Sequence, residues 1–293
     1  AVAFSDCSNV RNITLPEGLT NIGSFAFSGC SKLDNVVIPT TIKTINGGTF
    51  SHCISLTNIT IPENVTTIGD GNSVADFSRN IRNSGAFGYC INLKQIELPN
   101  VSSLGKYSLS QCTRLTDIKT TEGIINNIGD YCFAYSTSLR DIKLYDSISN
   151  IGKGAFKGCE TLNNVILPKN ASFTKLSSDT FAQCTNLSEI TIPENITSFL
   201  NGSKVTNLQA TTPVIGDGIF SDCTSLVDIK LPSKLTNIGN EAFSGCHSLK
   251  SIDMPEAVTS VGDYAFYDCR KLTSVKYGTK LTTIGRYAFE NCM

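Results

Sequence analysis

The stretch LVDIKLPSKLTNIGNEAFSGCHS, residues 226–248, is followed at once by a second copy of the same pattern, LKSIDMPEAVTSVGDYAFYDCRK, residues 249–271. Both copies place leucine, two alternating β-formers, proline, an Ile/Val-Gly pair, Ala-Phe and cysteine at the same positions. The shared unit reads L-x-x-[IV]-x-[ILM]-P-x-x-[LVI]-x-x-I-G-x-x-A-F-x-x-C-x-x. A regular period in the range of about 20–50 residues is typical of a solenoid or another repeat array.

The cysteines show that the unit extends over the whole chain. Phenylalanine precedes each repeat cysteine by three residues, with Leu109 as the exception, and leucine follows by three, with Val10 in the first unit. Ser136 replaces the cysteine once, and Cys132 lies off the pattern, in the place of the alanine. The repeat positions hold eleven of the twelve cysteines: Cys7, Cys30, Cys53, Cys90, Cys112, Cys159, Cys184, Cys223, Cys246, Cys269 and Cys292.

Each unit has the features of one coil of a solenoid. The stretch Leu-x-x-Ile-x-Leu alternates apolar and polar residues, which predicts a half-buried strand that the proline ends. The Ile-Gly pair indicates a close backbone approach or a positive φ. We expect the Ala-Phe-x-x-Cys-x-x-Leu segment to form one helical or 3₁₀ turn with Phe and Cys pointing inward. One coil cannot bury its own apolar stripe, so neighbouring coils must stack.

The unit closely resembles that of the BspA-like, or treponemal-type, leucine-rich repeats, and the resemblance covers essentially residues 3–293. It implies an α/β repeat solenoid: a right-handed arc of about twelve units, with one short parallel strand per unit on the concave face. We expect a single domain over residues 1–293. The resemblance also implies a surface-exposed or secreted protein with a role in adhesion.

Composition limits the kinds of partner that we expect. The net charge of −1 and the isoelectric point near 6.2 give no electrostatic reason for nucleic-acid binding. No apolar run approaches the roughly 18 residues of a membrane helix, so direct membrane insertion is not expected. The chain opens and closes within a unit, at Phe4 and Cys292, which indicates a piece of a longer protein.

Two segments interrupt the period. Both enter between the strand-ending proline and the Ala-Phe pair, at about residues 70–83 and 199–214. Insertions in repeat proteins commonly carry binding residues, so Asp76, Phe77, Arg79 and Arg82 are candidate ligand contacts. The alternative is that both are tolerated surface loops, because lengthening a loop costs little free energy.

The cysteine column admits metal binding, a disulfide ladder or simple packing. No C-x-x-C pair is present, and the two histidines, His52 and His247, lie far apart in the repeat order. Parallel stacked side chains do not point at one another, and Ser136 fills one position without disturbing the register. These observations favour a small buried residue with a weak S–H donor, with no metal and no cofactor.

A catalytic site is not indicated. Nucleophilic hydrolysis usually needs a histidine beside a serine or cysteine, with a carboxylate that orients it. Each histidine lies next to a buried repeat cysteine, which places it on its own coil and not in a shared site. No glycine-rich phosphate loop is evident either. We therefore expect no enzymatic activity.

The predicted strands offer a candidate binding face. The residues on either side of the central β-former point outward and form two columns across the stacked coils. The early units carry mostly Asn and Thr, whereas later units carry acidic residues and lysine. The charged members are the candidate ligand contacts: Glu97, Asp117, Lys119, Asp141, Lys143, Glu189, Asp228, Lys230, Asp253 and Lys276.

The resemblance and the mixed-charge face together lead to a functional expectation. We expect a non-enzymatic module, at the cell surface or secreted, that binds a host or matrix protein or a glycan through the concave face and the inserted loops. A structural spacer and an intracellular protein-interaction scaffold are the alternatives. The strand face would equally suit a solvated surface selected for solubility.

Overall fold

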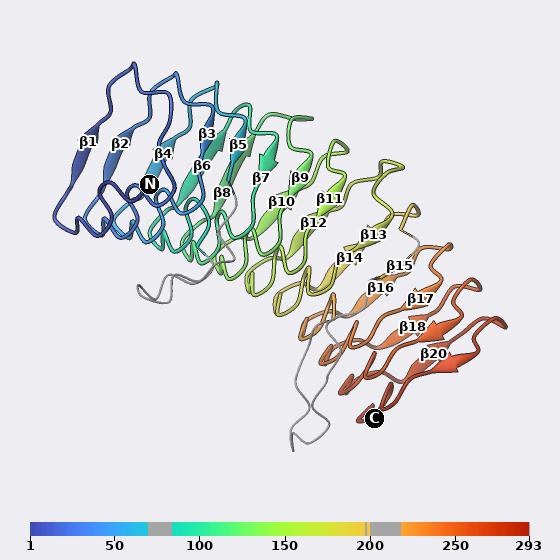
Figure 1. The fold of residues 1–293 in the computed structure, drawn as a ribbon. Helices are drawn as coiled ribbons and strands as arrows, with labels where there is room; N and C mark the ends of the chain where they lie inside the picture. Colours follow the sequence, from blue (N-terminus) through green and yellow to red (C-terminus); the bar gives the residue numbers. More distant parts are fainter. Residues whose placement is uncertain (70–83, 197, 200–217, 293) are drawn as a thin grey trace. The chain divides into compact units, whose positions relative to one another are not determined.

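The computed structural model describes residues 1–69, 84–196, 198–199 and 218–292. The chain forms two compact units, here called unit 1 (Ala1–Leu139 with Ser147–Ala155) and unit 2 (Arg140–Asp146 with Phe156–Met293). Within each unit, successive coils stack side by side (Figure 1). The single-domain organisation over residues 1–293 stays a prediction.

The predicted parallel strands are confirmed at the Leu-x-x-Ile-x-Leu segments. Equivalent positions of neighbouring coils pair in register, as Asn12 with Asn35 and Glu189 with Asp228. Asn58 still pairs with Gln95 across the first insertion. In unit 1 these first strands are β1 (Asn12–Thr14), β2 (Asn35–Val37), β4 (Asn58–Thr60), β6 (Gln95–Leu98) and β8 (Asp117–Thr120). In unit 2 they are β10 (Asp141–Lys143), β12 (Asn164–Ile166), β14 (Glu189–Thr191), β16 (Asp228–Lys230), β18 (Ser251–Asp253) and β20 (Ser274–Lys276).

The predicted strand of each coil is joined by a second short strand at the position of the Ile-Gly pair, which the sequence pattern did not predict. Its apolar residue is buried in most coils, with Ile284 exposed at 56%. Where glycine follows, it lies against the preceding coil: a Cβ on Gly262 would lie 2.5 Å from the backbone nitrogen of Asn240. In unit 1 the second strands are β3 (Thr44–Ile45), β5 (Thr67–Ile68), β7 (Ser103–Leu104), β9 (Asn127–Ile128) and β11 (Asn150–Ile151). In unit 2 they are β13 (Lys175–Leu176), β15 (Ser198–Phe199), β17 (Asn237–Ile238), β19 (Ser260–Val261) and β21 (Thr283–Ile284).

The Ala-Phe-x-x-Cys segment is a chain of turns and not a helix. Its backbone N–H groups alternate between neighbouring-coil and local acceptors: Phe243 donates to the carbonyl of Ala265 at 2.8 Å, and Ser244 to that of Glu241 at 3.1 Å. Glu241 and Gly245 are left-handed, with φ of 55° and 72°. A helix needs right-handed residues throughout, so this alternation prevents one.

The described ranges therefore contain no helix, and the α part of the predicted α/β label is wrong. The fold is a solenoid of parallel strands and turns. No helix that is long and apolar enough to span a membrane occurs in the part of the chain that the structure describes.

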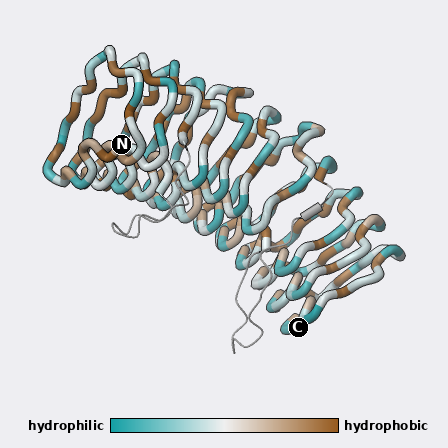
Figure 2. The backbone as a smooth tube through the Cα atoms, in the orientation of Figure 1, coloured by the Kyte–Doolittle hydropathy of each residue, from teal (hydrophilic) through white to brown (hydrophobic). Residues whose placement is uncertain are grey.

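The core is built from the repeated apolar residues, so hydrophobic and hydrophilic stretches alternate around each coil (Figure 2). The phenylalanine rings stack coil on coil, with centroids 5.5 Å apart for Phe50 and Phe87 in unit 1 and 5.4 Å apart for Phe220 and Phe243 in unit 2. Leu109 fills the same buried position in one coil of unit 1. Offset ring pairs of this kind add to the free energy of apolar burial.

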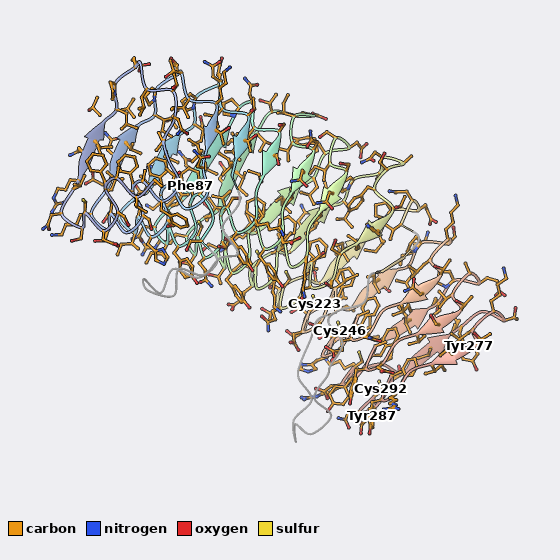
Figure 3. All side chains as sticks on the ribbon, in the orientation of Figure 1. Phe87, Cys223, Cys246, Tyr277, Tyr287 and Cys292 are labelled. Atoms are coloured by element: carbon orange, nitrogen blue, oxygen red, sulfur yellow. The ribbon has the colours of Figure 1, made fainter. Side chains whose placement is uncertain are left out.

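The cysteine column is a ladder of thiol hydrogen bonds. Along the column the thiol donates to the carbonyl of the phenylalanine one coil earlier, as Cys53 Sγ does to Phe27 O and Cys246 Sγ to Phe220 O, both at 3.2 Å. Ser136 Oγ makes the same bond to Leu109 O at 2.9 Å. Figure 3 labels Cys223 and Cys246 on successive coils. All twelve cysteines lie within the described residues, and ten of them are buried, with Cys7 and Cys292 partly exposed. This burial agrees with the packing interpretation.

Candidate ligand-binding surface

The outward side chains of the first strands form a continuous face within each unit, here called the strand face. In β16, Asp228 and Lys230 are exposed whereas Ile229 between them is 5% exposed. This alternation follows from the two-residue period of a strand. In-register pairing then stacks equivalent side chains of adjacent coils, as the sequence predicted.

The inserted segments contribute no described contact to this face. Residues 70–83 and 200–214 lie outside the described residues, and so do the candidate contacts Asp76, Phe77, Arg79 and Arg82. The second insertion begins one residue later than predicted, because Phe199 belongs to β15 and pairs with Leu176. Phe199 thus stands where most coils have the isoleucine of the Ile-Gly pair.

Four of the predicted contacts neutralise each other. Lys119 Nζ lies 2.7 Å from Glu97 Oε1 in unit 1, and Lys276 Nζ lies 3.2 Å from Asp253 Oδ2 in unit 2. The hydrogen bond to Glu97 raises the pKa of Lys119. Both pairs are solvent-exposed, and such pairs add little stability. Their main effect is to remove charge from the face that would otherwise meet a ligand.

Two further predicted contacts, Lys143 and Asp117, lie outside the hollow that is described below. Lys143 Nζ sits 4.7 Å from the centre of the Tyr145 ring, a cation–π contact within its own coil. Asp117 belongs to unit 1, in β8 with Lys119. Neither residue lines the hollow described next.

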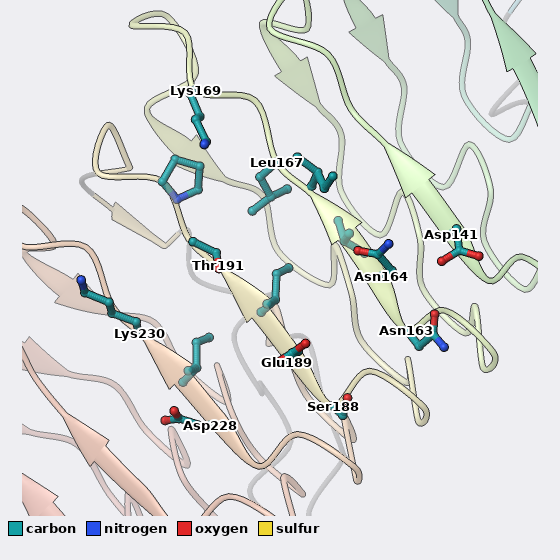
Figure 4. A pocket seen from close by; sticks show the side chains of 15 residues that line it. Asp141, Asn163, Asn164, Leu167, Lys169, Ser188, Glu189, Thr191, Asp228 and Lys230 are labelled. Carbon is teal, nitrogen blue, oxygen red and sulfur yellow. The ribbon is translucent and has the colours of Figure 1, made fainter.

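The remaining predicted contacts gather in a hollow on the strand face of unit 2. It has a volume of about 860 Å³, spans β10, β12, β14 and β16, and brings together Asp141, Glu189, Asp228 and Lys230 (Figure 4). The sequence analysis missed other lining residues because they carry no charge or lie outside the two columns. These residues include Asn163, Ile166, Lys169 and Ser188.

The hollow has an acidic edge and a basic edge. Asp141, Glu189 and Asp228 stand at the amino ends of their strands. Lys230 ends β16, and Lys169 follows the proline after β12. The outward residues of one strand are two positions apart, so the column of Lys230 is about 7 Å from the acidic column. Ile166, which is 48% exposed, occupies the position of Lys230 in its own coil, and Lys169 follows it beyond the end of β12.

Lys230 forms no ion pair with any described residue. Its column neighbour in the next coil is Asp253, whose Oδ2 lies 3.2 Å from Lys276 Nζ. Asp253 and Lys276 are in register in the β18–β20 pair.

The histidines lie on the turn segments, each with its own partner. His52 stacks on Tyr89 in unit 1 with ring centroids 4.5 Å apart, and burial lowers the pKa of His52. His247 Nε2 lies 3.0 Å from Asp268 Oδ2 in unit 2. No cluster of three or more His, Cys, Asp or Glu side chains suited to a metal ion is found among the described residues.

Comparisons with known proteins agree with the fold. The family model described as "BspA type Leucine rich repeat region (6 copies)" matches residues 1–74, 79–207 and 199–293. No curated protein matches the sequence. A leucine-rich repeat protein from Bacteroides ovatus has 26% identity and a TM-score of 0.62, over 100% of this chain and 79% of that chain. One from Eubacterium ventriosum has 22% identity and a TM-score of 0.59, over 99% and 73%. The pneumococcal vaccine antigen PcpA has 14% identity and a TM-score of 0.54, over 97% and 78%.

Proposed function

Because the chain belongs to the BspA-type leucine-rich repeat family, we propose that it is a non-enzymatic module that binds a protein or glycan ligand through the strand face of unit 2. We further propose a cell-surface or secreted location and a role in adhesion, on the basis of the family resemblance. The inserted segments at 70–83 and 200–214 are proposed to add contacts.

The observation that carries the proposal is the set of charges in the hollow of unit 2. Glu97, Lys119, Asp253 and Lys276 are satisfied by partners within the protein. Asp141, Glu189 and Asp228 form no ion pair or side-chain hydrogen bond with any described residue. Solvated charges on a rigid, preformed surface are free to pair with a ligand without first breaking an internal contact.

The shape of the surface supports a broad interface. The hollow is only partly enclosed and spans four coils (Figure 4). It lacks the deep enclosure that small-molecule pockets use to bury most of a ligand. Many modest contacts across several coils suit a macromolecular ligand, and clustering of copies would add avidity.

The experiment compares two sets of four substitutions, each of which replaces a charged side chain by a neutral one. The test variant carries Asp141→Asn, Glu189→Gln, Asp228→Asn and Lys230→Gln. The matched control carries Glu97→Gln, Lys119→Gln, Asp253→Asn and Lys276→Gln, which alters as many strand-face charges, all of them internally paired. Both are compared with the unchanged protein for attachment to an array of immobilised matrix proteins and glycans.

We expect the test variant to lose at least about tenfold in apparent affinity, because several ligand contacts are removed together. The control should attach like the unchanged protein. Circular dichroism melting of all three proteins checks that the fold is kept. Equal attachment of the test variant, or no attachment of the unchanged protein, would overturn the proposal. Separate deletions of 70–83 and 200–214 measure the contribution of each insertion.

A further inference from the structure

The two edges of the hollow in unit 2 differ in charge, and this difference restricts the ligand. The acidic edge holds Asp141, Glu189 and Asp228. The basic edge holds Lys169 and Lys230, with Thr191 between them in the coil order (Figure 4). A complementary ligand therefore carries cations along one side and anions along the other.

The spacing of the edges matches an extended polypeptide that crosses the strands. Adjacent coils are about 4.8 Å apart, so the acidic edge from β10 to β16 is about 14 Å long. Side chains on one side of an extended chain recur about every 6.8 Å. The carboxylates lie on the first, third and fourth coils, because β12 has Asn164 at this position, so they stand at about 0, 10 and 14 Å along the edge. Three basic side chains at alternate positions, at about 0, 7 and 14 Å, come within about 3 Å of them, a gap that long flexible side chains bridge. The intervening side chains would point to the lysines.

The floor of the hollow suits the same ligand. Ile166 stands in the column of Lys230, between Asn164 and Lys169 along its own coil, and is 48% exposed, whereas Val165 is only 7% exposed. Long charged side chains lay their methylene stems on such an apolar surface while their charged ends reach outward. An extended peptide with lysine, arginine or glutamate side chains can use both the floor and the edges.

The lining residues favour a polypeptide over a glycan. None of the residues that line the hollow is aromatic, and all of them lie in described parts of the chain. A sugar ring would find no aromatic face on which to stack its C–H groups. A uronic acid would be attracted by the lysines but repelled by the three carboxylates.

We propose that the hollow binds an extended polypeptide segment in which basic and acidic side chains alternate. Basic side chains face Asp141, Glu189 and Asp228, and acidic side chains face Lys169 and Lys230. This inference rests on the proposed binding function of the strand face. It adds the chemistry of the ligand and its orientation, with the peptide running across the strands.

The test uses two fluorescent peptides of the same composition. One alternates lysine and glutamate over about eight residues, long enough to cross the four coils. The other places all lysines before all glutamates. Binding is measured by fluorescence anisotropy to the full chain at low and at moderate salt, because pairing between exposed charges is screened by ions.

We expect the alternating peptide to bind about tenfold more tightly than the block peptide, since only the alternating order satisfies both edges along their full length. The Asp141→Asn, Glu189→Gln and Asp228→Asn variant should lose this preference. The Asp253→Asn and Lys276→Gln control should keep it. Equal binding of the two peptides, or no binding of either, would overturn the inference, and so would exclusive attachment to glycans on the array.

Failure of this inference is distinguishable from failure of the proposed function. If the test variant loses attachment to the protein array but peptide order has no effect, the ligand chemistry is wrong and the binding face is right. If the test variant keeps its attachment to the array, the strand face of unit 2 is not the binding face.

Discussion

Replacing one repeat cysteine by serine or by alanine tests whether the thiol column is a hydrogen-bond ladder or only an apolar filler. Cys246 is fully buried, and its Sγ donates to Phe220 O at 3.2 Å. The same carbonyl accepts the backbone N–H of Cys223 at 3.1 Å. Removing the thiol therefore takes away one of two hydrogen bonds without leaving the carbonyl unpaired.

The two substitutions differ in what they keep. Cys246→Ala loses a hydrogen bond worth about 1 kcal/mol and buried sulfur volume worth about another 1 kcal/mol, so we expect a loss of about 2 kcal/mol. Cys246→Ser loses the sulfur volume but keeps a donor, as Ser136 shows with its 2.9 Å bond to Leu109 O. Its expected loss is about 1 kcal/mol.

The assay is urea unfolding in reducing buffer, monitored by circular dichroism. The free energies of unfolding are compared only if the variants have the same slope of free energy against urea concentration. We expect the stability order unchanged protein, Cys246→Ser, Cys246→Ala. If the thiol were only an apolar filler, a buried hydroxyl without an acceptor would cost about 1–3 kcal/mol and serine would be worse than alanine. That reversed order would refute the ladder. Ser136→Cys makes the reverse change at the equivalent buried position and should raise the stability by about 1 kcal/mol, which makes it the matched control.

Three further predictions concern ionisable groups. Burial raises the pKa of thiols such as Cys90, and that of Cys132 to about 12. A thiol reagent at mildly alkaline pH should therefore react slowly with the buried cysteines of the native protein, and faster with the partly exposed Cys7 and Cys292. Unfolding in denaturant without reductant should expose twelve reactive thiols, and a count near zero would contradict the thiol assignment. Hydrogen bonds from the Thr279 hydroxyl and backbone N–H lower the pKa of Glu256, so its stabilising effect is present above the unfolded pKa of about 4.3 and is lost as pH falls through the lower folded value. Glu256→Gln should therefore flatten the fall of the unfolding midpoint below about pH 4.3, and an unchanged acid slope would contradict this. Burial raises the pKa of Asp222, so ionisation of this carboxyl in the folded protein lowers stability as pH rises from the unfolded to the folded pKa. Asp222→Asn should therefore raise the unfolding midpoint at neutral pH. The gain should disappear below about pH 3.9, where the carboxyl is protonated in both states. Asparagine tolerates the left-handed backbone at this position, φ 57°, so a lower midpoint at neutral pH would count against the burial argument.

The repeated sequence pattern predicts most of the fold. Phe243, Cys246 and Leu249 are fully buried, as their recurrence predicts, and the pairing of Asn58 with Gln95 follows from counting positions. Stacked coils that are nearly identical have only one register that buries every apolar column. The periodicity of the turn segment was misleading, because Phe and Cys at a spacing of three also suit a helix. The left-handed residues that prevent a helix, such as Glu241 and Tyr264, have no fixed residue type.

The candidate site was only partly predictable. The two charged columns were read correctly from the strand pattern, but four of their members form ion pairs with each other. Ile166 and Lys169 line the hollow although the charge pattern did not select them. The sequence gives the order of the outward side chains along the coils. It does not predict with which neighbour a long, flexible side chain forms an ion pair.

The sequence by itself determined the coil, its length, its core columns and the register of its strands, because stacking identical units leaves a single way to bury the apolar residues. Only the tertiary structure decided which charges remain available to a ligand. Asp253 lies in sequence order between Lys230 and Lys276, and in the structure its Oδ2 lies 3.2 Å from Lys276 Nζ. The physical reason is that an exposed ion pair depends on the local backbone separation, which the repeat period does not encode.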